Sequence, residues 1–264
     1  MKPLVIMAVA VALVSLIIGC GGPKVSHYEE SRITSMAWAG DTLIAYSKIT
    51  ERGFLAEGIK RNPKISINLW IAEVDPALGK LDTTYMLKEI PAPLGRIEFF
   101  PGGEKLLYAA EDGVWKMDLR NGERKQFFTH PSFRDLPLEI TVGPGEEYSA
   151  IVVDAEGMPA SEGLLDLFMI ETETGILVFH TDSLKDAKSF AWNSHDCISY
   201  IQPDPWNEGQ NVIMQFGVTD CIIKPSDMTE EEVICNCPQP NLSSSGRWLA
   251  YDDGGKLKIE ENGE

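Results

Sequence analysis

The chain is short of basic residues, and this shortage excludes one class of partner. It has 23 lysines and arginines against 40 aspartates and glutamates in 264 residues, with a formal net charge of −17. A phosphate backbone is held by a basic surface that releases counterions, so the composition predicts no nucleic-acid partner. Anionic lipid headgroups should repel such a chain as well. Any attachment to a membrane therefore needs a cause other than net charge.

Sequence motifs of the common catalytic and metal sites are missing too. The sequence has no Gly-x-Ser-x-Gly elbow, no phosphate-binding glycine loop and no Asp-x-Asp-x-Asp calcium loop. Its four histidines, His27, His130, His180 and His195, have no spaced set of further ligands around them. The sequence therefore predicts no cofactor, no metal and no catalytic residue.

The longest apolar run lies at the N-terminus and is too short for a comfortable membrane span. It extends from Leu4 to Ile18 behind the basic Lys2 and ends abruptly at Gly19-Cys20. This is the layout of a secretory signal. A cysteine directly after a small residue resembles the lipobox of bacterial lipoproteins. The resemblance implies cleavage after Gly19, a lipid on the Cys20 thiol and acylation of the new N-terminus; an uncleaved anchor helix or a plain secretory signal are the alternatives.

These features divide the chain and predict its compartment. Residues 1–19 are expected to be a lipoprotein signal peptide, residues 20–24 a lipidated tether, and residues 25–264 a single domain. The tether beyond Cys20 spans at most ~14 Å. The protein is then extracytoplasmic in a bacterial cell envelope. Because Gly21 rather than aspartate follows Cys20, the resemblance to lipoproteins implies an outer-membrane, periplasm-facing position if the host has two membranes.

A short turn motif recurs five times along the rest of the chain. Each copy has an apolar strand, a turn of Gly, Pro, Ser or Asp, and a second apolar strand ending in Tyr or Ile. Third and fourth strands follow most copies, with predicted turns after the third strand at Leu78-Gly79, Asn121-Gly122 and Thr174-Gly175, and no window shows a sustained helical period. A repeat of roughly fifty residues with four short strands is typical of a propeller blade. The sequence thus predicts an all-β fold, a β-propeller of about five four-stranded blades. The copies are residues 38–46, 99–108, 142–151, 192–200 and 242–251.

Two of these copies, residues 99–108 and 242–251, resemble the WD-repeat-like blades of the TolB family. The turn in that family runs roughly Trp-Ser-Pro-Asp-Gly-Lys-x-Leu-Ala-Tyr. The resemblance covers most of the chain after residue 24, although each copy is degenerate. It implies a propeller fold and a tendency toward protein binding, and it implies no catalytic residues.

The fifth copy stops where its fourth strand should begin, so the ring needs another way to close. We expect part of residues 25–33 to supply that outer strand and remove an open edge; an open ring or a strand from a partner is the alternative. An outer strand of this kind starts on the side of the tight turns. That side would then face the membrane, and the long connections 49–66, 155–163 and 202–210 would form the binding side.

The remaining cysteines and one tryptophan are candidate site residues. An exported compartment permits disulfides, and four cysteines allow three pairings. Cys197 and Cys221 lie on predicted neighbouring strands and so could face each other, while the Cys-x-Cys spacing does not fit a zinc site. Trp206 lies in a predicted long loop, as a binding residue or as a packed anchor of that loop. The four cysteines are Cys197, Cys221, Cys235 and Cys237.

These observations favour a lipid-anchored, extracytoplasmic propeller that is a protein-interaction or scaffold module and not an enzyme. Its partners would be the membrane, through the lipid, and another envelope protein. The alternative is a carbohydrate-active propeller with two channel carboxylates about 5–10 Å apart. The acidic pairs at 111–112 and 252–253 lie at predicted turns, where they would shape the backbone. A structural remnant that once shielded a peptidase domain is a third reading.

Overall fold

The computed structural model describes most of the chain after residue 24, and its elements are β-strands. No helix in the described part of the chain has the length and apolar character needed to cross a bilayer. The signal peptide and tether predicted for residues 1–24 lie outside the described residues. The described ranges are 25–87, 93–110, 112–129, 139–154, 163–192, 194, 196–204, 207, 209–217, 222–226, 228–230, 233, 243–245 and 247–262.

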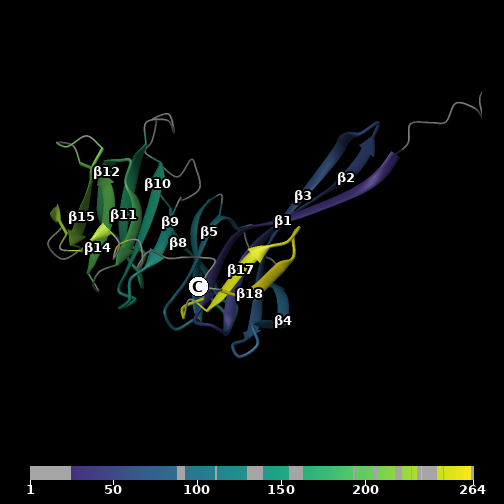
Figure 1. The fold of residues 1–264 in the computed structure, drawn as a ribbon, viewed down its shortest axis with the longest axis horizontal. Helices are drawn as coiled ribbons and strands as arrows, with labels where there is room; N and C mark the ends of the chain where they lie inside the picture. Colours follow the sequence, from purple (N-terminus) through teal and green to yellow (C-terminus); the bar gives the residue numbers. More distant parts are fainter. Residues whose placement is uncertain are drawn as a thin grey trace, which may run out of the picture. The chain divides into compact units, whose positions relative to one another are not determined.

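Eighteen strands within these ranges form five antiparallel sheets, each made of strands that follow one another in the chain (Figure 1). The predicted turn copies connect the first two strands of sheets 1 to 4, and the fifth copy leads into β17. Sheet 1 contains β1 (Val25–Ala39), β2 (Leu43–Ala56), β3 (Ile59–Asp75) and β4 (Lys80–Leu87); sheet 2 contains β5 (Pro93–Phe99), β6 (Lys105–Ala110), β7 (Gly113–Asp118) and β8 (Arg124–Phe128); sheet 3 contains β9 (Glu139–Val142), β10 (Tyr148–Asp154), β11 (Leu164–Glu171) and β12 (Leu177–Lys185); sheet 4 contains β13 (Lys188–Trp192), β14 (Cys197–Pro203), β15 (Asn211–Gly217) and β16 (Ile222–Pro225); and sheet 5 contains β17 (Trp248–Asp252) and β18 (Leu257–Glu261).

The sheets pack face to face in series, because successive residues of a strand point to opposite faces. On β6, Leu106 and Tyr108 join an apolar cluster with sheet 1, whereas Leu107 and Ala109 join one with sheet 3. Further clusters connect sheet 3 to sheet 4 and sheet 5 to sheet 1. Both faces of a middle sheet are buried in this way, which explains the nearly continuous apolar character of strands such as β6 and β10. This is how propeller blades pack.

The turns between third and fourth strands share one glycine geometry. Gly79, Gly122 and Gly175 have φ of +60°, +72° and +77°, a region that other residues rarely adopt. Each donates its N–H to the carbonyl oxygen four residues earlier, at 2.8–2.9 Å. The turns predicted at these three positions are confirmed. Gly79 is also buried, and a Cβ there would collide with the ring of Trp248 in sheet 5.

The prediction that residues 25–33 complete the last sheet is wrong. These residues form the first part of β1 and lie beside β2 in sheet 1, and the described neighbour of β18 is β17 alone. The segment continues without a break into the rest of β1, so one long strand forms. Sheet 5 is held to sheet 1 by packing and by single hydrogen bonds instead. Trp248 Nε1 donates to the Pro76 carbonyl oxygen at 3.2 Å, and the Ile33 N–H donates to Asp252 Oδ2 at 3.1 Å.

The outer parts of β1, β2 and β3 belong to a compact unit of their own, which includes residues 25–31 and 50–66. We call the described part of this unit the arm. The prediction of a long loop at 49–66 is wrong, because β2 and β3 continue through it and are joined by Glu57-Gly58, both with positive φ. The start of β1 and this turn lie at the same end of the arm (Figure 1). The prediction that the N-terminal strand starts on the tight-turn side is therefore also wrong.

Alanine at Gly79 and at Gly122 should separate backbone strain from contact between sheets. Both positions have the same left-handed geometry, which costs alanine about 1–2 kcal/mol. Only Gly79 lies against Trp248, so Gly79→Ala should lose a further ~1–3 kcal/mol from overpacking. Urea unfolding of both variants measures this difference. Equal losses would show that sheet 5 does not depend on this contact.

Candidate functional site

Most of the predicted site residues lie outside the described part of the chain. These residues are Cys20, Trp206, Cys221, Cys235 and Cys237. Their predicted roles in lipidation, binding and disulfide formation stay predictions. Cys197 is described and begins β14, opposite Gly217 of β15. It is half-buried and its thiol is free.

The acidic pairs predicted to shape turns do so where they are described. Asp112 Oδ1 accepts a hydrogen bond from Trp115 Nε1 at 2.8 Å in the turn before β7. Asp252 Oδ1 accepts one from the Gly255 N–H at 2.6 Å, between β17 and β18. Asp112 thus shapes its own turn, whereas Asp252 binds both its turn and the Ile33 N–H of β1.

Two other carboxylates, which the sequence analysis missed, lie on the first strands of neighbouring sheets. Glu98 is on β5 and Glu139 is at the start of β9, and these two strands contact each other. Both side chains are partly buried. The signal that could have found them is a charged residue within a buried apolar strand, as in Ile97-Glu98-Phe99.

Burial changes the ionisation of this pair. Burial, together with the negative charge of Glu139, raises the pKa of Glu98 to about 8, while Arg96 opposes the change. Burial also raises the pKa of Glu139, again against the effect of Arg96. Glu98 therefore keeps its proton at neutral pH. A carboxyl group in this state can donate a proton or a hydrogen bond.

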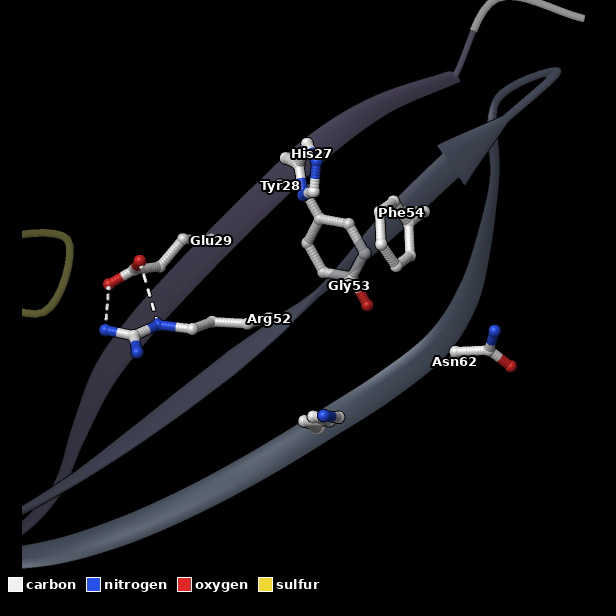
Figure 2. A pocket seen from close by; sticks show the side chains of 8 residues that line it. His27, Tyr28, Glu29, Arg52, Gly53, Phe54 and Asn62 are labelled. Carbon is white, nitrogen blue, oxygen red and sulfur yellow. Dashed lines mark hydrogen bonds and ion pairs between the residues drawn. The ribbon is translucent and has the colours of Figure 1, made fainter.

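A second candidate site is a groove on the arm, with a volume of about 680 Å³ (Figure 2). The rings of His27 and Phe54 meet at one end of it, with centroids 4.5 Å apart. Further along, Arg52 binds Glu29 through two nitrogens, at 2.9 and 3.1 Å. The complete lining consists of His27, Tyr28, Glu29, Arg52, Gly53, Phe54, Asn62 and Lys64.

Gly53 makes room for an aromatic ring within the arm. A Cβ at this position would lie 2.8 Å from Tyr28 Cε1 and equally close to the Arg61 carbonyl oxygen. The Tyr28 hydroxyl donates to Glu51 at 2.6 Å, and this hydrogen bond raises the pKa of Tyr28. Lys60 lies over the same ring at 4.9 Å and also binds Glu30 at 2.7 Å. Most acidic side chains of the arm are thus bound by its own residues.

Two bases of the arm differ from the others. Among the described residues, Arg61 and Lys64 have no carboxylate within ion-pair distance, and both are exposed. Lys64 lines the groove, where Glu29 already neutralises Arg52. The groove therefore has a surplus of one positive charge in a strongly acidic chain.

An apolar stretch is exposed at the outer edge of sheet 3. Ile176, Leu177 and Val178 are 61 %, 38 % and 38 % exposed. Leu177 and Val178 begin β12 and Ile176 directly precedes it; this strand pairs with β11 on one side and has no other described neighbour. Farther along β12, His180 stacks on the buried ring of Phe168 at 4.4 Å. The stretch is therefore fixed through the pairing of β12 with β11, while the side chains of residues 176–178 are exposed to solvent.

Solved structures with the same architecture come from proteins of several kinds. An acylaminoacyl peptidase from Pyrococcus horikoshii matches at a TM-score of 0.50 and 14 % identity, over 89 % of this chain and 38 % of the peptidase. The β-propeller domain of the Trilobed protease from Pyrococcus furiosus matches at 0.47 and 14 %, over 89 % and 69 %. The fold is a β-propeller. At this identity the likeness extends to the fold alone, and the chain spans less than two-fifths of the acylaminoacyl peptidase.

An oligogalacturonate lyase in complex with manganese also matches, at a TM-score of 0.44 and 12 % identity, over 83 % of this chain and 61 % of the lyase. No family model matches the chain, and no curated protein does. A propeller fold by itself does not determine function, because one fold can be used for many activities.

The raised pKa of Glu98 predicts how stability depends on pH. Because the folded protein holds this proton up to about pH 8 and the unfolded chain releases it near its ordinary value, stability should fall as the pH rises through that window. Relative to Glu98→Gln, the wild type should lose up to about 1.4 kcal/mol for each pH unit. Urea unfolding of both proteins at pH 5, 6.5 and 8 measures the slope. Parallel profiles would show that Glu98 ionises normally.

Proposed function

We propose that this protein is a lipid-anchored, extracytoplasmic β-propeller that acts as a protein-interaction or scaffold module of the bacterial cell envelope. The lipid is on Cys20, the position is the periplasmic side of the outer membrane if two membranes exist, and the partner is another envelope protein. The observation that carries the interaction role is the exposed apolar edge of β12. The lipobox-like end of the apolar N-terminal run supports the anchor.

The edge of β12 has the features of a strand-addition site. Proteins protect free strand edges with charged side chains and proline. Residues 176–181 include neither. A partner strand would gain main-chain hydrogen bonds along this edge and bury apolar side chains such as Ile176 and Val178. Both faces of the sheet are packed against neighbouring sheets through buried residues such as Phe168 and Met169. The edge is therefore presented by a rigid support.

The alternative function, a carbohydrate-active propeller, is favoured by one observation, the Glu98–Glu139 pair. Glycoside hydrolysis uses a protonated carboxyl group as acid and a second carboxylate as base or nucleophile. The raised pKa of Glu98 supplies the first group near neutral pH, and Glu139 on the adjacent strand would be the second. In this reading the pair acts on a sugar bound near the first strands.

Crosslinking in the native envelope tests the interaction role. The protein should yield a specific protein adduct, and Ile176→Glu with Val178→Glu should weaken binding of that partner at least about tenfold, because two apolar contacts are lost. Lys125→Glu, at an exposed position on the outer strand β8, is the control and should bind as the wild type does. The affinity of the purified pair gives the number. A partner that binds the double variant normally would rule out the edge as the interaction site.

Turnover of a glycan panel tests the alternative. If the propeller cleaves a glycan, Glu98→Gln should lower kcat by at least about a hundredfold, because general acid catalysis is lost. Glu104→Gln, an exposed position in the turn before β6, should leave turnover unchanged. The absence of turnover on every glycan, or full activity of Glu98→Gln, would remove this reading.

A further inference from the structure

The arm is the described part of the chain nearest to Cys20. Val25 begins β1 at the end of the arm where β2 and β3 are joined, and the four residues between Cys20 and Val25 span at most ~14 Å. If Cys20 carries a lipid, which is the proposed function on which this step rests, this end of the arm is held close to the bilayer surface. The arm's exposed chemistry is then presented to lipid headgroups.

The charges of the arm suit an anionic surface better than the rest of the chain does. Its described residues include four acids and four bases, in a chain whose net charge is −17. Three of the acids, Glu29, Glu30 and Glu51, are paired with Arg52 or Lys60. Arg61 and Lys64 have no such partner among the described residues. The arm is therefore neutral overall, with Arg61 and Lys64 outside its ion pairs, whereas the whole chain is strongly acidic and would be repelled.

The same end of the arm exposes apolar side chains. Val25 is 57 % exposed, Phe54 38 % and Ile59 54 %. Aromatic and aliphatic side chains of this kind are favourable at the boundary between headgroups and acyl chains. Phe54 lines the groove together with Lys64. One surface thus combines an exposed ring with a free ammonium group, and an anionic phospholipid has matching parts in its acyl chains and its phosphate.

We infer that the groove of the arm binds the phosphate headgroup of an anionic phospholipid and forms a second contact between protein and membrane. Lys64 supplies the charge for the phosphate, and the His27–Phe54 pair contacts the apolar region beneath it. Arg52 stays paired with Glu29 and keeps that carboxylate from repelling the headgroup. The lipid on Cys20 holds the protein at the membrane, and the groove sets how the arm is oriented there.

Photocrosslinking with matched positions on the arm tests this inference. In the full-length protein in vesicles, the photoreactive residue benzoylphenylalanine replaces either Phe54, in the groove, or Ile65, which is exposed on β3 but does not line it. Both positions lie in the same arm, so proximity through the tether alone gives similar lipid adducts at both. Binding in the groove should give at least about five times more adduct at position 54, and only when the phosphatidylcholine vesicles contain phosphatidylglycerol.

A charge variant gives an independent measurement. Lys64→Gln should lower the phosphatidylglycerol adduct at position 54 about fivefold, the factor expected for one basic residue near anionic lipid. Lys258→Gln, on β18, is the matched control and should leave the adduct unchanged. Equal adducts at both positions, adducts independent of phosphatidylglycerol or Lys64, or adducts that join two copies or another protein would each overturn the inference.

Mass spectrometry of the N-terminal peptide keeps the two proposals apart. A lipidated Cys20 with uniform adducts would leave the anchor standing and remove the groove as a headgroup site. An unmodified Cys20 would remove the anchor, and the same crosslinking with added vesicles would still decide whether the groove binds phosphatidylglycerol.

Discussion

Burial of both faces of each middle sheet against its neighbours is the constraint on which the rest of the structure depends. A single four-stranded sheet covers too little apolar area to be stable alone, so alternate residues of one strand, such as Leu106 and Leu107, are buried in different interfaces. Packing between sheets also determines which residues the turns can contain. Gly79 has no side chain because the ring of Trp248 occupies the space beside it. A substitution in one sheet is therefore expected to change the packing of the neighbouring sheet.

The arm is stabilised differently. Its strands are connected by polar cross-strand pairs such as Glu29–Arg52 and Tyr28–Glu51, and its ion pairs lie largely in solvent, where each contributes little. Exposed backbone hydrogen bonds and few buried apolar contacts are typical of regions with low local stability. A bound headgroup would add to the stability of such a segment. This is consistent with a role in contact rather than in support.

The partly buried carboxyl groups of Glu98 on β5 and Glu139 on β9 lower the stability of the packed sheets. Desolvation keeps Glu98 protonated near neutral pH, and an apolar residue at this position would avoid the penalty. Buried ionisable groups of this kind are found at functional sites as well as in structural networks. The pair thus gives the enzymatic alternative its physical basis, whereas the apolar edge of β12 gives the interaction role its own.

The sequence alone predicted the all-β class, the five turn copies and the glycine turns at Gly79, Gly122 and Gly175. It could do so because apolar alternation and turn-forming residues are local properties of the chain. Whether residues 25–33 would pair with β2 or with the last sheet was not a local question. Both β2 and the last sheet offer backbone groups for pairing, and the choice between them depends on contacts between residues far apart in the chain. The same reason explains why Glu98 and Glu139, 41 residues apart in the sequence, were missed. Only the contact between β5 and β9 places them on adjacent strands and removes enough water to change their ionisation.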